Sequence, residues 1–111
     1  MDNKICLILS TTDSREHAEM IADTLVFEHL AACVQIGAAL RSTYYWEGNA
    51  QTESEYPLSI KTTFQNVEKL RKRFMQLHTY KCPQWICLQA EASQDYAKWV
   101  EESCSDKIKL D

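Results

Sequence analysis

The sequence predicts an α+β fold of the ferredoxin-like class, in which helices cover one face of a four-stranded antiparallel sheet. Apolar runs and alternating stretches follow one another in the order β-α-β-β-α-β, and a further helical segment comes last. The 111 residues include only two Gly and two Pro, so most of the chain should be regular elements joined by short loops. Nothing resembles a linker, and we expect a single domain over residues 1–111.

The first predicted strand is the apolar run at residues 5–9, which should be buried on both faces. A helix is predicted over residues 13–29, where apolar side chains recur at helical spacing. Asp13 can cap this helix, and Glu16 three residues later can complete a capping box.

Two further strands are predicted to pair as a hairpin. Residues 32–36 are β-prone and residues 40–47 alternate with a period of two, which predicts one long strand bent near Gly37. A turn at residues 47–49 leads into a strand at residues 56–62.

The second half of the chain predicts a helix, a strand and a last helix. Thr62 and Gln65 resemble a capping box, and the helix after them should end before Pro83. Residues 85–90 form the fourth strand, and Ser93 caps the last helix. The buried side of the middle helix should carry Val67, Leu70, Phe74 and Leu77.

The sheet carries more apolar surface than these helices can cover. The first strand is apolar on both sides, and Tyr44, Trp46 and Trp85 are too large and apolar to be left in water. The simplest cover is another copy of the same chain, which could also pair the strand edges of residues 40–47.

Charge and composition argue against several classes of protein. The net charge of −4 is the wrong sign for a nucleic-acid binder, so no nucleic-acid partner is expected. The apolar run Ile5–Leu9 is too short for a signal peptide or a membrane span, so we expect a cytoplasmic protein with no membrane partner. Nucleophile–base pairs and phosphate-binding loops are not recognisable, and no enzymatic activity is expected.

The five cysteines do not form a C-x-x-C pair, which argues against a structural zinc site. Cys6, Cys33 and Cys87 lie in apolar runs and are predicted to be small core residues. Cys104 falls on the apolar side of the last helix, and Cys82 is the cysteine expected to be accessible.

Five blocks, in order and at matching spacing, resemble the CutA family of divalent cation tolerance proteins. They are LAACVQI at 30–36, YYWEG at 44–48, Glu55 with IKTT at 60–63, LHTYKCP at 77–83, and Asp95-Tyr96 with Trp99. The resemblance implies a homotrimer similar to the PII signalling proteins, linked to tolerance of divalent metals and of copper especially. It implies neither a catalysed reaction nor a required cofactor.

The resemblance also points to a metal site. The family's copper-binding members use three positions that match Ser10, Leu77 and His78 here, and only His78 keeps a metal-binding side chain. His78 is therefore the first candidate ligand for copper or another divalent ion, and Cys82 is the second. The alternative is that the His78 ring is packed or hydrogen-bonded at a subunit junction.

A second interpretation is a PII-like signalling module that binds a small ligand in a cleft between subunits. The residues that could line such a cleft are Tyr44, Trp46, Glu47, Lys61 and Tyr80. The aromatic members could equally be core or interface residues. Lys61 ends an apolar strand and needs a partner, for which Glu47 and Glu55 are available.

Other titratable residues are expected at the surface. His17 and His29 lie on the first helix and are predicted to be solvent-exposed. Glu53 and Glu55 are two apart on a strand and therefore share one face, which could form a cation or acid–base site. An exposed hairpin lip is the alternative.

Overall fold

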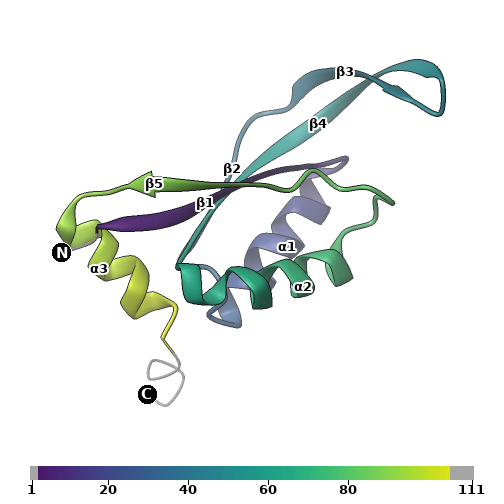
Figure 1. The fold of residues 1–111 in the computed structure, drawn as a ribbon. Coiled ribbons are helices and arrows are strands. Elements are labelled where there is room, and N and C mark those ends of the chain that lie inside the picture. Colours follow the sequence, from purple (N-terminus) through teal and green to yellow (C-terminus); the bar gives the residue numbers. More distant parts are fainter. Residues whose placement is uncertain (1–2, 106–111) are drawn as a thin grey trace.

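The computed structural model describes residues 3–105 and contains five strands, three α-helices and one 3₁₀ helix (Figure 1). In chain order they are β1 (Lys4–Thr12), α1 (Arg15–Phe27), β2 (Cys33–Ile36), β3 (Leu40–Trp46), β4 (Asn49–Thr62), η1 (Phe64–Asn66), α2 (Val67–Leu77), β5 (Ile86–Glu91) and α3 (Gln94–Ser103). The ends of the predicted domain 1–111 lie outside the described residues.

The sheet confirms the ferredoxin-like prediction. Its strand order is β2-β4-β1-β5 with every pair antiparallel, and β3 pairs with β4. Helices α1 and α2 lie side by side along one face of the sheet (Figure 1). The core between them consists of fully buried apolar side chains. They include Ile8, Leu58 and Ile60 from the sheet, Ile21 and Leu25 from α1, and Leu70 and Phe74 from α2.

Helix α1 begins two residues later than expected. The cap is Ser14, whose side chain accepts a hydrogen bond from the His17 backbone amide at 3.1 Å. The predicted capping box of Asp13 and Glu16 does not form, because Ser14 takes the capping position. At its other end α1 is tied to α2, since the Arg73 guanidinium donates to the Glu28 carboxylate at 3.0 Å.

The strand predicted to bend near Gly37 is divided into two. Both β2 and β3 pair with the same strand, β4, and three residues, 37–39, lie opposite only two, Tyr56 and Pro57. This is a bulge of one extra residue. A Cβ atom on Gly37 would lie 2.8 Å from Cγ of Pro57, so the close approach of the two chains requires glycine here.

Strand β4 is much longer than predicted, because it begins at Asn49 rather than Tyr56. Its second half pairs with β1 and β2, and its first half pairs only with β3. The β3–β4 hairpin therefore projects beyond the body of the molecule (Figure 1). Its turn uses the left-handed backbone conformation at Glu47 (φ 50°) and Gly48 (φ 82°).

The chain around α2 departs from the sequence prediction at two points. Thr62 does not cap the helix, because its hydroxyl donates to the Leu30 carbonyl at 2.6 Å, and η1 intervenes before α2. Trp85 precedes β5 and packs against Phe74 with ring centroids 5.4 Å apart. Trp85 is half-buried, because α2 covers part of it, and it therefore needs less cover from another chain than the sequence suggests.

The other side of the sheet is open over β1 and β5. Leu7 lies opposite Leu88, and Leu9 lies opposite Ile86. Strand alternation turns these four side chains away from Ile8 and the helices. Leu88 and Ile86 are each 45% exposed. We call these four residues the open apolar face.

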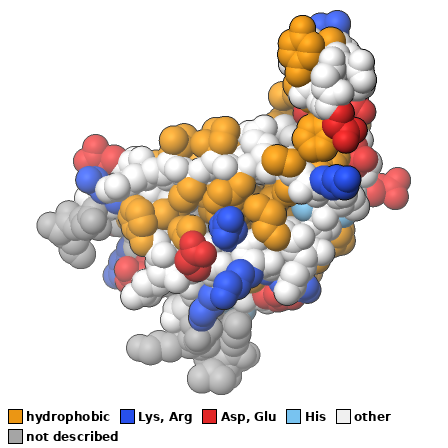
Figure 2. Space-filling model, turned by 45° about the vertical axis from the view of Figure 1, so that its right-hand side comes forward, with side chains coloured by type: hydrophobic (Ala, Val, Ile, Leu, Met, Phe, Trp, Pro, Cys, Tyr) orange, Lys and Arg blue, Asp and Glu red, His pale blue; other side chains and the backbone are white. Residues whose placement is uncertain are grey.

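Helix α3 packs at the end of the sheet where β1 begins. Val100 and Cys104 contact Ile5 and Ala32, so α3 covers one end of the apolar side and leaves the open apolar face bare. Hydrophobic side chains gather over the body of the molecule and again on the projecting hairpin (Figure 2). Among residues 3–105, no helix has the length and apolar character needed to cross a membrane.

Candidate functional site: a polar cluster at the base of the hairpin

His78 is buried at the C-terminal end of α2, and both of its ring nitrogens have partners. Nε2 lies 2.7 Å from the Thr11 carbonyl oxygen, and the Tyr80 backbone amide donates to Nδ1 at 3.1 Å. A carbonyl oxygen only accepts, so Nε2 carries the proton and the ring is neutral. Burial lowers the pKa of His78 below its ordinary value, and the bond to Thr11 offsets this only in part.

Glu55 lies beside this ring and is 8% exposed. Its carboxylate accepts a hydrogen bond from the Tyr80 hydroxyl at 2.7 Å and another from the Thr11 hydroxyl at 3.2 Å. Burial and the bond to Glu55 both raise the pKa of Tyr80. The expectation that Glu55 sits on an exposed lip is wrong, whereas Glu53 is exposed and accepts from the Tyr44 hydroxyl. These residues join the β3–β4 hairpin to β1 and to the end of α2.

The other two histidines are half-buried rather than surface residues. The His17 ring packs edge-on against His78 with centroids 5.7 Å apart, and its buried Nε2 has no hydrogen-bond partner among the described residues. His29 Nδ1 lies 3.1 Å from the Ser103 carbonyl oxygen and links α1 to α3. Both differ from the prediction because helices pack over them.

The three positions that match the copper ligands do not fit a copper site within one subunit. Ser10 is buried and donates from its hydroxyl to the Gln84 carbonyl at 2.7 Å, Leu77 has no ligand atom, and both nitrogens of His78 are engaged. Cys82 is exposed, as predicted. In the described part of the chain, no three His, Cys, Asp or Glu side chains are grouped so as to hold a metal ion.

The predicted cleft residues are spread along the subunit. Tyr44, Trp46 and Glu47 lie on the projecting hairpin, whereas Tyr80 is part of the buried cluster. Trp46 pairs with Asn49 at the start of β4, and Lys61 lies near the end of that strand. At about 3.3 Å per residue, the two ends of β4 are roughly 40 Å apart.

Lys61 finds partners other than the carboxylates considered for it. Its ammonium group donates to the Gln35 side-chain oxygen at 2.8 Å and lies 5.7 Å from the ring centroid of Tyr96. Glu47 is on the distant hairpin and Glu55 bonds to Tyr80, so neither pairs with Lys61.

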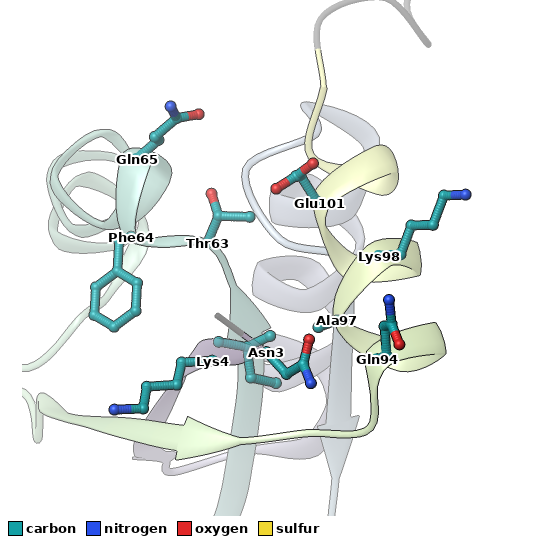
Figure 3. A pocket seen from close by; sticks show the side chains of 10 residues that line it. Asn3, Lys4, Thr63, Phe64, Gln65, Gln94, Ala97, Lys98 and Glu101 are labelled. Atoms are coloured by element: carbon teal, nitrogen blue, oxygen red, sulfur yellow. The ribbon is translucent and has the colours of Figure 1, made fainter. Parts of the chain in front are cut away.

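A groove of about 500 Å³ lies where α3, η1 and the start of β1 meet (Figure 3). Phe64, which is 52% exposed, forms one wall, and Lys98 and Glu101 project from α3 on the other. None of the residues predicted for the metal site or the cleft lines it. The sequence carried no signal for this groove, because its lining comes from three distant segments of mixed polarity.

Comparison with known proteins assigns the chain to a family. A family model described as "CutA1 divalent ion tolerance protein" matches residues 6–103. The chain belongs to this family. The resemblance seen in the five sequence blocks is thereby confirmed, and the match extends from within β1 to the end of α3.

Relatives and solved structures match most of this chain. A divalent-cation tolerance protein CutA of Thermus thermophilus is 40% identical over 98 residues, which cover 87% of this chain and 95% of the relative. A solved CutA1 structure from Ehrlichia chaffeensis superposes with a TM-score of 0.88 at 28% identity, over 95% of this chain and 98% of that one. The family relative of Arabidopsis thaliana is named chloroplastic; it is 36% identical over 87% of this chain and 54% of its own length.

Proposed function

We propose that this chain works as a homotrimer that supports divalent-cation tolerance by binding or sensing metal ions, copper among them, and not by catalysis. Its relatives are named divalent-cation tolerance proteins, and the chain belongs to their family. The assembly is the part of the proposal that physical chemistry supports most directly.

The observation that carries the assembly is the open apolar face. Leu7, Leu9, Ile86 and Leu88 form a continuous two-by-two patch on adjacent strands. Monomeric soluble proteins rarely leave such an apolar sheet surface in water, since its burial releases about 25 cal/mol for each Å² covered. An identical copy has the complementary surface available.

The projecting hairpin supports the same conclusion. Tyr45 is 79% exposed and Trp46 is 42% exposed, and among residues 3–105 no strand pairs with the outer edge of the hairpin. A two-stranded hairpin of this kind is marginally stable alone, so packing against a second copy would stabilise it. The roughly 40 Å between Trp46 and Lys61 also means that a cleft containing both can form only between subunits.

The assembly is tested by light scattering of Leu88→Lys. Leu88 is exposed in one subunit, so the substitution should leave the subunit folded but place a charge in the proposed interface. We expect the molar mass to fall from that of three chains toward that of one. The matched control is Met75→Lys, which changes an exposed apolar side chain on α2 and should keep the mass of the trimer. A wild-type mass of one chain would refute the assembly.

The metal part is tested by titrating copper(II) into the wild type and His78→Ala. His78 is the only matching position with an imidazole, and a copper ion there would have to replace the bond that the Tyr80 amide makes to Nδ1. We expect weaker copper binding by the variant. Equal affinity would remove His78 as a ligand and leave the assembly proposal unchanged. If metabolites and not metals raised the melting temperature, the PII-like alternative would replace the metal proposal.

A further inference from the structure

Two cysteines on neighbouring strands face the same side of the sheet. Cys87 on β5 lies directly opposite Ile8 on β1, and Cys6 lies two residues before Ile8. Because side chains alternate along a strand, Cys6, Ile8 and Cys87 share one side, and the two cysteines are diagonal neighbours. This placement follows from the strand register.

The two thiols differ in access. Cys6 is 1% exposed, whereas Cys87 is exposed because β5 is an edge strand. The prediction that Cys87 is a core residue is therefore wrong. Burial first, and then the neighbouring Cys87 thiol, raise the pKa of Cys6 to about 12. An ion from solvent can therefore reach the Cys87 thiol first, and the Cys6 thiol is buried next to it.

The diagonal placement favours a bridging ion over a disulfide. Diagonal neighbours in an antiparallel pair have Cα atoms roughly 7–8 Å apart, at or beyond the limit of about 7 Å for a disulfide. A metal ion bound by two thiolates needs the sulfurs only about 4.6 Å apart, twice a typical zinc–sulfur bond length. Side chains at diagonal positions on one face of the sheet can bring their sulfurs to this separation.

The ligand count selects the kind of ion. Structural zinc takes four ligands, and the described residues offer no group of three or more His, Cys, Asp or Glu side chains for a metal. Thiolates favour soft ions, and monovalent copper accepts two of them. We propose that Cys6 and Cys87 form a two-coordinate site for Cu(I).

Binding is a proton exchange at the two sulfurs. Each thiol gives its proton to solvent as its sulfur bonds to the ion, and the copper remains monovalent, so no oxidant or reductant takes part. The pair lies on the helix-covered side of the sheet, away from the open apolar face. The site requires neither His78 nor a second subunit, and its failure would leave the proposed function untouched.

The experiment is an anaerobic titration of the full chain with Cu(I), in competition with a chromogenic Cu(I) chelator. The wild type should bind one ion per chain at the pair and show ultraviolet thiolate-to-copper absorption. Cys87→Ser and Cys6→Ser should each weaken binding roughly 100-fold or more, because the second thiolate binds as an intramolecular ligand at high effective concentration. The matched control, Cys82→Ser, removes an exposed thiol five residues from Cys87 and should bind as the wild type does.

Two results would overturn the site. One is Cu(I) affinity in Cys87→Ser equal to that of the wild type. The other is an equal loss in Cys82→Ser, which would show that any exposed thiol accounts for binding. If buried Cys6→Ser fails to fold, as shown by its melting curve, Cys87→Ser at the exposed position still decides the question.

Discussion

At the scale of single residues, Glu55 is a charged side chain that lies buried instead of in solvent. It is a carboxylate at 8% exposure, stabilised by two hydroxyl donors from Tyr80 and Thr11. Burying a charge is costly unless hydrogen bonds replace the lost water, and here they come from segments before and after β4. Glu55 therefore fastens the hairpin to the body of the subunit.

We expect Glu55→Gln to lower the free energy of unfolding by about 1–3 kcal/mol. The amide cannot accept both hydroxyl donors with the strength of a carboxylate, and one group is left poorly satisfied in a buried place. Urea denaturation at fixed protein concentration measures the loss. Glu53→Gln is the matched control two residues away; it is exposed, so we expect a change within about 0.5 kcal/mol. Equal losses in both variants would contradict the fastening role.

The pKa of His78 predicts a dependence of stability on pH. Burial holds it below the ordinary value of 6.5, so the unfolded chain takes up the proton first as the pH falls. The stability contributed by the neutral ring is present above about pH 6.5 and is lost as the pH decreases toward the folded-state pKa. We expect unfolding free energy to fall more steeply between about pH 7 and pH 5 in the wild type than in His78→Asn. Parallel curves would show that other groups cause the dependence.

Part of this residue-scale picture was accessible from the sequence. Because the sequence blocks identified His78 and Tyr80, both members of the polar cluster were named as candidates. The burial of Glu55 was not, because alternation places it on the same face as the exposed Glu53. What distinguishes the two is the pair of hydroxyl donors to Glu55, Tyr80 at 25 residues and Thr11 at 44 residues along the chain. Contacts at such separation leave no local pattern.

At the scale of secondary-structure elements, the bulge between β2 and β3 shows how a local contact sets strand geometry. The Gly37 backbone amide donates to the Pro57 carbonyl at 3.0 Å, which holds the two strands together at the extra residue. The sequence indicated a bend through Gly37. The division into two strands also depends on Pro57, which pairs with Thr11 and lies across from the bulge.

We expect Gly37→Ala to destabilise the protein by about 1–3 kcal/mol, since the new methyl group would meet Cγ of Pro57 at 2.8 Å. Pro57→Ala removes that atom. A double-mutant cycle by chemical denaturation should then show that Gly37→Ala costs less in the Pro57→Ala background. Additive losses would mean that the backbone at the bulge, rather than the ring of Pro57, sets the requirement for glycine.

Helix ends were less predictable than helix faces for a related reason. Leu70 and Phe74 were identified as buried from their spacing, and both are fully buried. The start of α1 was placed at Asp13 because Asp and Ser cap helices almost equally well, and nothing in the local sequence decides between neighbours. Ser14 is the cap here, and the Thr12 hydroxyl, two residues earlier, donates to the Ser14 carbonyl at 2.8 Å.

At the scale of the whole molecule, the subunit is elongated, with extents of 47, 27 and 23 Å. A chain of 111 residues can bury only a small core, and an elongated shape leaves more of its surface in water. The projecting hairpin adds exposed aromatic side chains and contributes no residues to the apolar core. The excess apolar sheet surface was predicted from the first strand and from Tyr44, Trp46 and Trp85. Its position was predicted only in part, because Trp85 is half-buried against the core of its own subunit.

Assembly should make thermal stability depend on concentration. If the native state is a trimer and the unfolded chain is monomeric, mass action requires the melting temperature to rise with protein concentration. Scanning calorimetry over a hundredfold range of wild-type concentration measures this. Leu88→Lys should melt at a lower temperature that does not vary with concentration. An invariant wild-type melting temperature would indicate that subunits unfold independently of one another.

The extra residue at the bulge also changes which residues of the β2–β3 segment share a face of the sheet. Before the bulge, even-numbered Val34 and Ile36 lie opposite even-numbered Ile60 and Leu58; after it, even-numbered Leu40 lies opposite odd-numbered Glu55. The pairing register with β4 is therefore shifted by one residue between β2 and β3. Deleting a single alanine at 38 or 39 would leave two residues opposite Tyr56 and Pro57, with Leu40 still opposite Glu55. The strand pairing of the hairpin would survive, but the bend and the added twist that a bulge gives its strand would be lost. We therefore expect such a deletion to change the angle at which the hairpin leaves the sheet.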